Sequence, residues 1–307
     1  MYDSVGLRIS QEQAGSNLID CLPYLTDLSE TCKADGQVYY TGHLNNCKAY
    51  LSDSGLFIKG SLTKFYLGDN LHTLNRSDAR RAFEMMADIL HLPIQKATLT
   101  RIDAGLNIVT DFKPELYYPY LGQSNHYQRL TQPKSISYKN GLRLKQFYNK
   151  IAESKSKGVA IPAIYHGKNL LRYEVSYMQR LAKQFKQTHI TPATLTEEGF
   201  YMGLIDKVVQ EYEAIQKIGL INMDLTKIKY PKDLWNQVIA LCIKEKGPDA
   251  FLHLIDQLKE LRSFDKPEYY SRARKDVREY SKALAPDTPD LIKELDRKVA
   301  RIKQNYR

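Results

Sequence analysis

Apolar and polar residues alternate in short runs through the first half of the chain. Val5–Ile9 and Val38–Tyr40 follow this pattern, and Lys48–Leu51 and Leu56–Ile58 flank a turn at 52–55. A repeat of two places successive side chains on opposite faces of a sheet, and two such runs around a tight turn predict a hairpin. The pattern therefore predicts an N-terminal region built largely from strands.

A helical repeat follows these strands, with Ser77 as the expected N-cap and Pro93 as the stop. Its apolar positions are three and four residues apart: Ala79, Ala82, Phe83, Met86, Ile89 and Leu90. A long strand is then predicted from Ala97 to Val109. Three more strands are predicted at 135–139, 142–150 and 170–178. This order predicts an α+β fold, with an antiparallel-rich central sheet and helices on one face.

Beyond about residue 186 the repeat of two disappears. Five stretches have helical spacing, with prolines near their starts or between them: 197–218, 231–246, 248–262, 267–283 and 288–305. We therefore predict an α+β domain over residues 1–190 and a helical C-terminal domain over residues 191–307. The helical domain is expected to serve DNA recognition or oligomerisation.

The amino-acid composition indicates the class of protein and its redox environment. The 307 residues are 43% hydrophobic and 26% charged, which is typical of a water-soluble globular protein. The sequence has neither an uninterrupted apolar run of about 18 residues nor a secretory signal, so no membrane association is expected. Four cysteines at irregular spacings, without a C-x-x-C pair, favour reduced thiols in a cytoplasm.

Positive charge is concentrated in one stretch of the sequence. The whole chain has a net charge of +10, and residues 128–186 alone carry 13 basic and 2 acidic side chains, a net +11. A concentrated basic segment is typical of a surface that neutralises phosphates, whereas a merely solvated surface mixes both signs. The segment favours a nucleic-acid partner, with Arg143, Lys145, Lys155 and Lys157 as candidate DNA contacts.

Two of the predicted strands each place a carboxylate one pleat away from an arginine. The first carries Arg101 and Asp103 on one face, and the second carries Arg172 and Glu174 on one face. If the strands are neighbours, the two carboxylates converge as oxygen ligands for Mg²⁺ or Mn²⁺, and the arginines contact phosphate. The alternative is a pair of cross-strand salt bridges on a solvated sheet face.

A further predicted strand carries Tyr148, with Lys150 two residues later and Glu153 beyond it. In a strand the tyrosine and the lysine point the same way. A phenol with a pKa of about 10 is a poor nucleophile, but a neighbouring ammonium group or divalent metal favours the phenolate. A tyrosine in an amphipathic strand is more often a packing residue, so both interpretations stay open.

Motifs for other chemistries are missing from the sequence. None of the seven histidines has the spacing of a zinc site, and there is no G-x-G-x-x-G, G-x-S-x-G or complete phosphate-loop motif. Nucleotide hydrolysis and serine hydrolysis are therefore disfavoured.

Four short motifs follow one another over about residues 40–186. They are Ile58–Lys64 with Gly68–Asn70, Thr100–Ala104, Phe147–Lys150 with Glu153, and Leu171–Val175. In this order and spacing they resemble the motifs of the phage and plasmid replication initiators related to the gene II and gene X proteins of filamentous phages. The helical C-terminal third carries no motif that can be assigned.

The resemblance implies a rolling-circle initiator with an HUH-like nicking domain. Such a protein nicks one origin strand through a tyrosine and a divalent metal, keeps a 5′-phosphotyrosine link, leaves a 3′ hydroxyl, and later rejoins the strand. By position, the resemblance makes Tyr148 the nucleophile, Asp103 and Glu174 metal ligands, Glu153 a third carboxylate and Lys150 a charge stabiliser. Related enzymes bind the metal through a His-x-His pair, which this sequence lacks, so a carboxylate-rich Mg²⁺ or Mn²⁺ site is expected.

The resemblance also implies partners. Single-stranded or supercoiled origin DNA is the expected substrate, in the cytoplasm of a bacterial host, with a host helicase and a second copy of the chain as further candidates. Tyr138 is a candidate second nucleophile, with packing as the alternative. The basic helix at 266–282 is a candidate for an added DNA contact. A conjugative relaxase with the same chemistry and a non-catalytic, sequence-specific DNA-binding protein are the alternative functions.

Overall fold

The computed structural model describes residues 1–218, 228–283 and 289–305. They form two compact units, one made of Met1–Gln216 with Leu291–Arg307 and the other of Lys217–Asp290. The boundary predicted at residue 190 therefore lies inside the first unit. The predicted outline missed this because the apolar faces of three later helices join the core of the sheet unit.

The first unit is built on one sheet of ten strands, in the order β2-β3-β4-β5-β1-β6-β11-β10-β9-β8. Every neighbouring pair is antiparallel. The strands are β1 (Tyr2–Ile9), β2 (Thr26–Cys32), β3 (Val38–Leu44), β4 (Cys47–Ser52), β5 (Gly55–Ser61), β6 (Thr98–Thr110), β8 (Gln128–Gln132), β9 (Ser135–Lys139), β10 (Arg143–Asn149) and β11 (Asn169–Tyr177). Two short strands, β7 (Leu121–Ser124) and β12 (Ile215–Lys217), pair separately. The predicted α+β class with a large antiparallel sheet is confirmed.

Helices of the first unit are α1 (Gln11–Ala14), α2 (Leu62–Leu67), α3 (Arg76–Leu90), α4 (Lys150–Ser156), α5 (Leu181–Phe185), α6 (Pro192–Thr196), α7 (Glu198–Glu213) and α11 (Asp290–Asn305). The predicted cap of α3 was two residues too late. Asn75 is the N-cap, because its side chain accepts from the backbone N–H of Asp78 at 2.8 Å and the Asp78 carboxylate reaches back to Asn75. Ser77 lies inside the helix.

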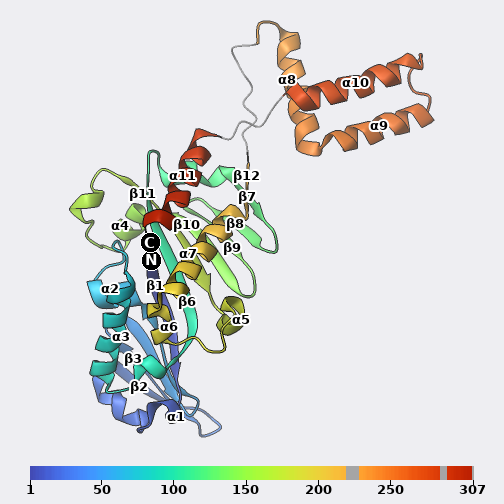
Figure 1. The fold of residues 1–307 in the computed structure, drawn as a ribbon. Helices are drawn as coiled ribbons and strands as arrows, with labels where there is room; N and C mark the ends of the chain where they lie inside the picture. The colour runs from blue at the N-terminus through green and yellow to red at the C-terminus, as the bar shows by residue number, and fades with distance from the viewer. Residues whose placement is uncertain (219–227, 284–288, 306–307) are drawn as a thin grey trace. The chain divides into compact units, whose positions relative to one another are not determined.

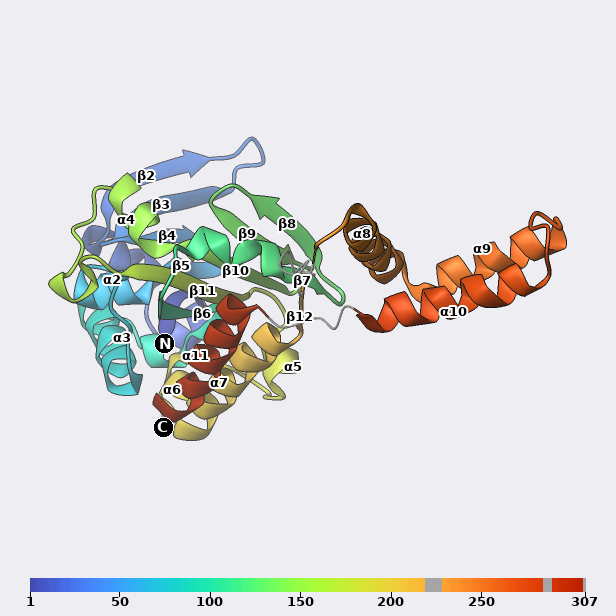
Figure 2. The same ribbon diagram turned by 90° about the horizontal axis from the view of Figure 1, so that it is seen from above.

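Figures 1 and 2 show α3, α6, α7 and α11 on one side of the sheet. Hydrogen bonds fix two of them there: the Tyr2 hydroxyl donates to the carbonyl of Leu195 in α6 at 2.6 Å, and the Tyr173 hydroxyl to that of Val208 in α7 at 3.1 Å. Residues of the central strands on this side are buried, as the alternation predicts. The opposite side, which we call the outer face, carries Arg101 and Glu174.

The second unit consists of α8 (Pro231–Lys246), α9 (Pro248–Glu260) and α10 (Glu268–Ala283). Its small core is formed by Ile243, Ile255, Tyr270 and Val277. The predicted helical character of this region is confirmed, and the basic stretch 266–282 falls largely on α10. Across the described ranges, no helix combines the length and the apolar character needed to cross a membrane.

Candidate active site

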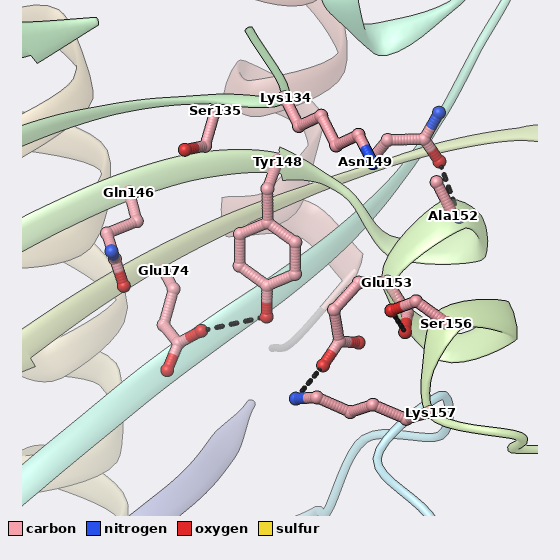
Figure 3. Close-up of a pocket in the computed structure, with 10 residues that line it drawn as sticks. All are labelled: Lys134, Ser135, Gln146, Tyr148, Asn149, Ala152, Glu153, Ser156, Lys157 and Glu174. Carbon is pink, nitrogen blue, oxygen red and sulfur yellow. Dashed lines mark hydrogen bonds and ion pairs between the residues drawn. The ribbon is translucent and has the colours of Figure 1, made fainter. Parts of the chain in front are cut away.

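Tyr148 lies on the outer face of β10, opposite Arg172 of β11 and Ser135 of β9. Its hydroxyl donates a hydrogen bond to Oε2 of Glu174 at 3.2 Å. A pocket of about 410 Å³ opens beside the ring, as Figure 3 shows. The pocket is lined by Lys134, Ser135, Gln146, Tyr148, Asn149, Ala152, Glu153, Ser156, Lys157 and Glu174. The phenol therefore combines an acceptor for its proton with an adjoining space for a ligand.

The two acidic strands are sheet neighbours, as the chemistry suggested by the sequence required. In the antiparallel register of β6 and β11, Asp103 lies opposite Ser176, and Gly105 lies opposite Glu174. A register pair shares one face of a sheet, so Asp103 and Glu174 both belong to the outer face. The strand between β10 and β6 thus brings the tyrosine and both carboxylates into one region.

A third carboxylate, Asp3 of β1, joins this region and was missed in the sequence. It is 3% exposed and accepts from Arg172 Nη2 at 2.5 Å and from the Ser61 hydroxyl at 3.0 Å. The strand predicted from the alternation began only at Val5, because an irregularity in pairing between Tyr2 and Val5 interrupts the repeat of two. An acid just before an apolar strand was the available signal.

The arginines of the two strands bind these carboxylates. Arg101 donates from Nε to Asp103 Oδ1 and from Nη2 to Asp103 Oδ2, both at 2.8 Å. Its Nη2 also donates to the Ser176 hydroxyl at 3.1 Å. Arg172 is 2% exposed, binds Asp3, and donates to Asn107 Oδ1 at 3.0 Å. The predicted DNA contact by Arg172 is therefore not supported, because its guanidinium is enclosed by the protein, whereas Arg101 is partly exposed.

Burial and charge shift the acidity of the site. Burial, with Asp3 and Asp103 nearby, raises the pKa of Glu174 to about 7, although Arg172 opposes the shift. Burial and then the charge of Glu174 raise the pKa of Tyr148 well above its usual range. Both shifts favour the protonated forms of Glu174 and Tyr148, and a cation bound beside them would favour their ionised forms.

Lys150 begins a helix rather than ending a strand. Strand β10 stops at Asn149, whose side chain caps α4 by accepting from the Ala152 N–H at 3.0 Å. The Lys150 side chain is buried and still reaches the site: its Nζ lies 5.8 Å from the centre of the Tyr148 ring and donates to Asn70 Oδ1 at 2.9 Å. Two of the four motifs identified in the sequence meet in this contact.

Glu153 faces lysines rather than the other carboxylates. It accepts from Lys150 Nζ at 2.9 Å and from Lys157, the C-cap residue directly after α4. Although burial raises the pKa of Glu153, the hydrogen bonds from Lys157 and Lys150 lower it by more, and the net shift is downward. As the side chains lie, Glu153 is neutralised by two ammonium groups, which does not support its predicted role as a metal ligand.

The arrangement of the carboxylates bears on whether they can hold a metal ion. Within the described ranges, no group of three or more His, Cys, Asp or Glu side chains is placed to hold a metal ion. Asp103 and Glu174 do share the outer face, and Mg²⁺ is often held by one or two carboxylates together with substrate phosphate. The three-carboxylate centre predicted from the sequence is thus not assembled among the described residues, and Asp103 and Glu174 are the pair that shares the outer face, with both oxygens of Asp103 bound by Arg101.

The basic stretch 128–186 divides between the two faces of the sheet. Lys157 lines the pocket and is 58% exposed, Lys155 is exposed on the same helix, and Lys134, which was not singled out in the sequence, also lines the pocket. Arg143 and Lys145 lie elsewhere. Both bind Glu211 of α7 on the helical side, and Lys145 is 0% exposed. The predicted DNA contacts of these two residues are therefore not supported.

Tyr138 is a packing residue in this structure. It is fully buried and its hydroxyl donates to the carbonyls of Leu121 and Gly122 at 3.0 and 2.9 Å. It lies opposite Lys145 in the strand register, on the face away from Tyr148. This arrangement supports the packing alternative over a second nucleophile.

Comparison with known proteins identifies the family of the chain. The search of curated proteins returned no match. A family model for the N-terminal region of the phage gene II replication-associated protein matches residues 1–197, which include the whole ten-stranded sheet and the pocket at Tyr148. Because the match covers more than half of the 307 residues, the chain belongs to this family of replication-associated proteins, the replication initiators of the filamentous phage gene II type.

Proposed function

We propose that the protein initiates rolling-circle replication by nicking one strand of a phage or plasmid origin with Tyr148. The hydrogen bond from the Tyr148 hydroxyl to Glu174, at the wall of an open pocket, carries the proposal. Family membership supports the replication role, and the pocket supports the chemistry. An HUH-like relationship of the nicking domain is part of this proposal.

The proposed reaction transfers a phosphoryl group without a nucleotide cofactor. The Tyr148 oxygen attacks the scissile phosphorus as its proton passes to Glu174 Oε2. The bond from phosphorus to the 3′ oxygen breaks, that oxygen takes up a proton, and a 5′-phosphotyrosine remains. The covalent link conserves the phosphodiester bond energy, so the reverse attack by a 3′ hydroxyl rejoins the strand.

Fixed positive charge supports this step. Lys150 Nζ lies beside the Tyr148 ring, and Lys134 and Lys157 line the pocket where a phosphate would enter. Such preorganised charge stabilises a phosphoryl transition state without reorganisation. Bound Mg²⁺ or Mn²⁺, held by Asp103 and Glu174, would supply further neutralisation of the phosphate oxygens.

The test incubates supercoiled plasmid carrying the cognate origin with the protein and Mg²⁺ or Mn²⁺. We expect relaxed product and a protein–DNA adduct from the wild type and neither from Tyr148→Phe, which keeps the ring. Failure of the wild type to nick would leave the alternative of a non-catalytic DNA-binding protein. An adduct formed by Tyr148→Phe would exclude this tyrosine as the nucleophile.

Further measurements distinguish a replication initiator from a conjugative relaxase and test the proposed protein partners. A conjugative relaxase would cut a transfer origin rather than a replication origin. Stimulation of unwinding by a host helicase and a dimer in sedimentation would establish the two protein partners that we propose. Binding to the origin by the second unit would establish the role proposed for α10.

A further inference from the structure

Three aromatic side chains form a row on the outer face, far along the sheet from Tyr148. Tyr39 of β3 and Tyr50 of β4 have ring centres 5.3 Å apart, and Tyr50 and Phe57 of β5 are 6.1 Å apart. All three are half-buried, so each ring keeps surface in contact with solvent. We call Tyr39, Tyr50 and Phe57 the aromatic row.

Cations stand at both ends of the aromatic row. The Lys33 ammonium lies 5.7 Å from the centre of the Tyr39 ring, and the Arg8 guanidinium lies 5.5 Å from that of Phe57. A hollow of about 240 Å³ adjoins the row, with Tyr39, Tyr50 and Lys33 in its wall together with Asp53 from the turn between β4 and β5. The row thus combines flat apolar faces, positive charge and space beside them.

Two lysines on the same strands have no partner of opposite charge. Lys48 of β4 lies directly opposite Lys59 of β5 in the register, and both are exposed. Like charges at such a position destabilise a sheet. Strands β3, β4 and β5 contain no Asp or Glu, and neither lysine forms an ion pair with any residue that the structure describes. An arrangement that costs stability and is left uncompensated points to an anionic ligand.

Packing alone does not account for this surface. Cross-strand aromatic pairs stabilise a sheet, which explains why the rings touch. It does not explain the opposed lysines or the absence of acids along three strands. Stacking faces with neighbouring cations are the features by which proteins bind single-stranded nucleic acid, because bases stack on rings and phosphates pair with lysines.

The aromatic row shares its face with the candidate active site. Phe57 lies opposite Arg8 of β1, and Arg8 lies opposite Thr98 of β6. Two residues before Arg8 on the same face, Gly6 lies opposite Arg101, the partner of Asp103. Four strand spacings separate β5 from β10, which is roughly 19 Å across the sheet at about 4.8 Å per strand. Along β6, Asn107 is level with Tyr148 and Thr98 is level with Phe57, which adds roughly 30 Å at about 3.3 Å per residue. The path is therefore roughly 35 Å long, which a single strand of about 16 nucleotides can span.

We propose that single-stranded DNA next to the cleaved phosphate crosses the outer face, with its bases stacked on the aromatic row and its phosphates on Lys48 and Lys59. This inference rests on the proposed nicking function and adds a binding track in the part of the chain that lacks a positive net charge. It makes the N-terminal strands, rather than the basic stretch 128–186 alone, part of the DNA surface.

The test measures binding of a fluorescent single strand of about 16 nucleotides, the upper end of single-strand site sizes, to Tyr148→Phe protein that cannot cleave. In this background we expect Tyr50→Leu to weaken binding about tenfold, because one stacked ring is lost. Tyr50→Phe keeps the ring and is expected to bind as the parent does. This pair of variants separates stacking from a packing defect.

The lysines are tested by salt dependence. Lys48→Gln with Lys59→Gln should lower the slope of log affinity against log salt by about 1.4, since each phosphate contact on a single strand contributes about 0.7. Arg80→Gln with Lys96→Gln removes two exposed charges on the helical side and should leave the slope unchanged.

The outcomes distinguish this inference from the proposed function. Nicking by the wild type, together with unchanged binding and slope in Tyr50→Leu and in the double lysine variant, would overturn the binding track alone. Equal weakening by Tyr50→Phe and Tyr50→Leu would also overturn it, since stacking would not be the cause. Absence of nicking with ring-dependent binding would support the track and overturn the nicking proposal.

Discussion

Arg172 Nη2 donates to Asp3 Oδ2 at 2.5 Å, and this bond joins β11 to β1 across the intervening strand β6. The guanidinium passes over Gly105, where a Cβ atom would lie 2.0 Å from Nη2. Only glycine therefore fits at this position of β6. This pair also holds Arg172 beside the candidate site, because Arg172 Nε lies 3.9 Å from Glu174 Oε2.

Gly105→Ala is expected to destabilise the protein by about 1–3 kcal/mol, since the added methyl group must displace a buried guanidinium. Denaturant unfolding of purified protein measures the change. Gly203→Ala is the matched control, because a Cβ there meets nothing within 4 Å and the position is inside helix α7. It should stabilise the helix by about 0.5–1 kcal/mol. Equal stability of the two variants would contradict the steric argument.

Asp3→Asn should cost about 3–5 kcal/mol of unfolding free energy, because it removes the nearer carboxylate from a buried arginine and leaves Arg172 only the longer contact to Glu174 at 3.9 Å. Arg172→Gln should cost a similar amount for the converse reason. The double variant is expected to lose much less than the sum of the two, since neither charge then remains. Denaturant unfolding of all four proteins gives the coupling energy, and simple additivity would show that the pair does not interact.

Asp103→Ala and Glu174→Ala should slow nicking on the order of 100-fold while retaining DNA binding, if these carboxylates hold the divalent ion. Both should also raise the Mn²⁺ concentration needed for half-maximal nicking. Glu153→Gln is the comparison, because that carboxylate is held by Lys150 and Lys157, and it should leave the Mn²⁺ requirement unchanged. The readout is a titration of supercoiled plasmid relaxation. If Glu153→Gln raised the required Mn²⁺ concentration as much as Asp103→Ala, Glu153 would be a third metal ligand after all.

Glu211 should make the free energy of unfolding depend on pH. Burial raises the pKa of Glu211, but Lys145 and its other partners lower it by more, so its folded pKa lies below the ordinary value of 4.5. A carboxyl with a depressed folded pKa contributes stability above its unfolded pKa and loses it as pH falls through the folded pKa. Urea unfolding should therefore show a large gap between wild type and Glu211→Gln at pH 7.

That gap should narrow as pH falls below the ordinary value of 4.5 and close as pH falls through the lowered folded pKa, since the wild-type carboxyl then becomes neutral as the amide is. Glu213→Gln, at an exposed position of the same helix, should show no comparable gap at either pH. A difference between wild type and Glu211→Gln that stays constant from pH 7 to pH 3 would contradict the assignment of this charge pair.

The sequence predicted the fold where burial differs between the two faces of a strand. Residues such as Ile102 and Tyr173 face the helices, and their polar neighbours face outward, so the alternation located the central strands. Strands β2 and β8 went unpredicted because neither buries a side chain and both lie at the ends of the sheet. Without a buried face there is no apolar repeat to detect.

The strands that carry the candidate site were predicted from the sequence, but its members only in part. Tyr148, Asp103 and Glu174 share the outer face, as the repeat of two required. Lys145 was assigned to the DNA surface from its charge alone, without regard to the face of the strand on which it lies. It lies three residues before Tyr148 on β10, so its side chain points toward the helices. Asp3 could not be found by strand pairing, since contacts between β1 and β11 across β6 depend on the whole sheet order.

The return of α11 to the sheet unit has a consequence for dissecting this protein. Ile292, Leu295 and Val299 of α11 are buried in the core that also contains strand residues, so the helical unit at 217–290 is a loop-out between two parts of one domain. A truncated chain ending before residue 291 would expose that core to water. The complete sheet unit without the helical unit would instead be obtained by removing the middle segment and joining the two flanking parts with a short linker.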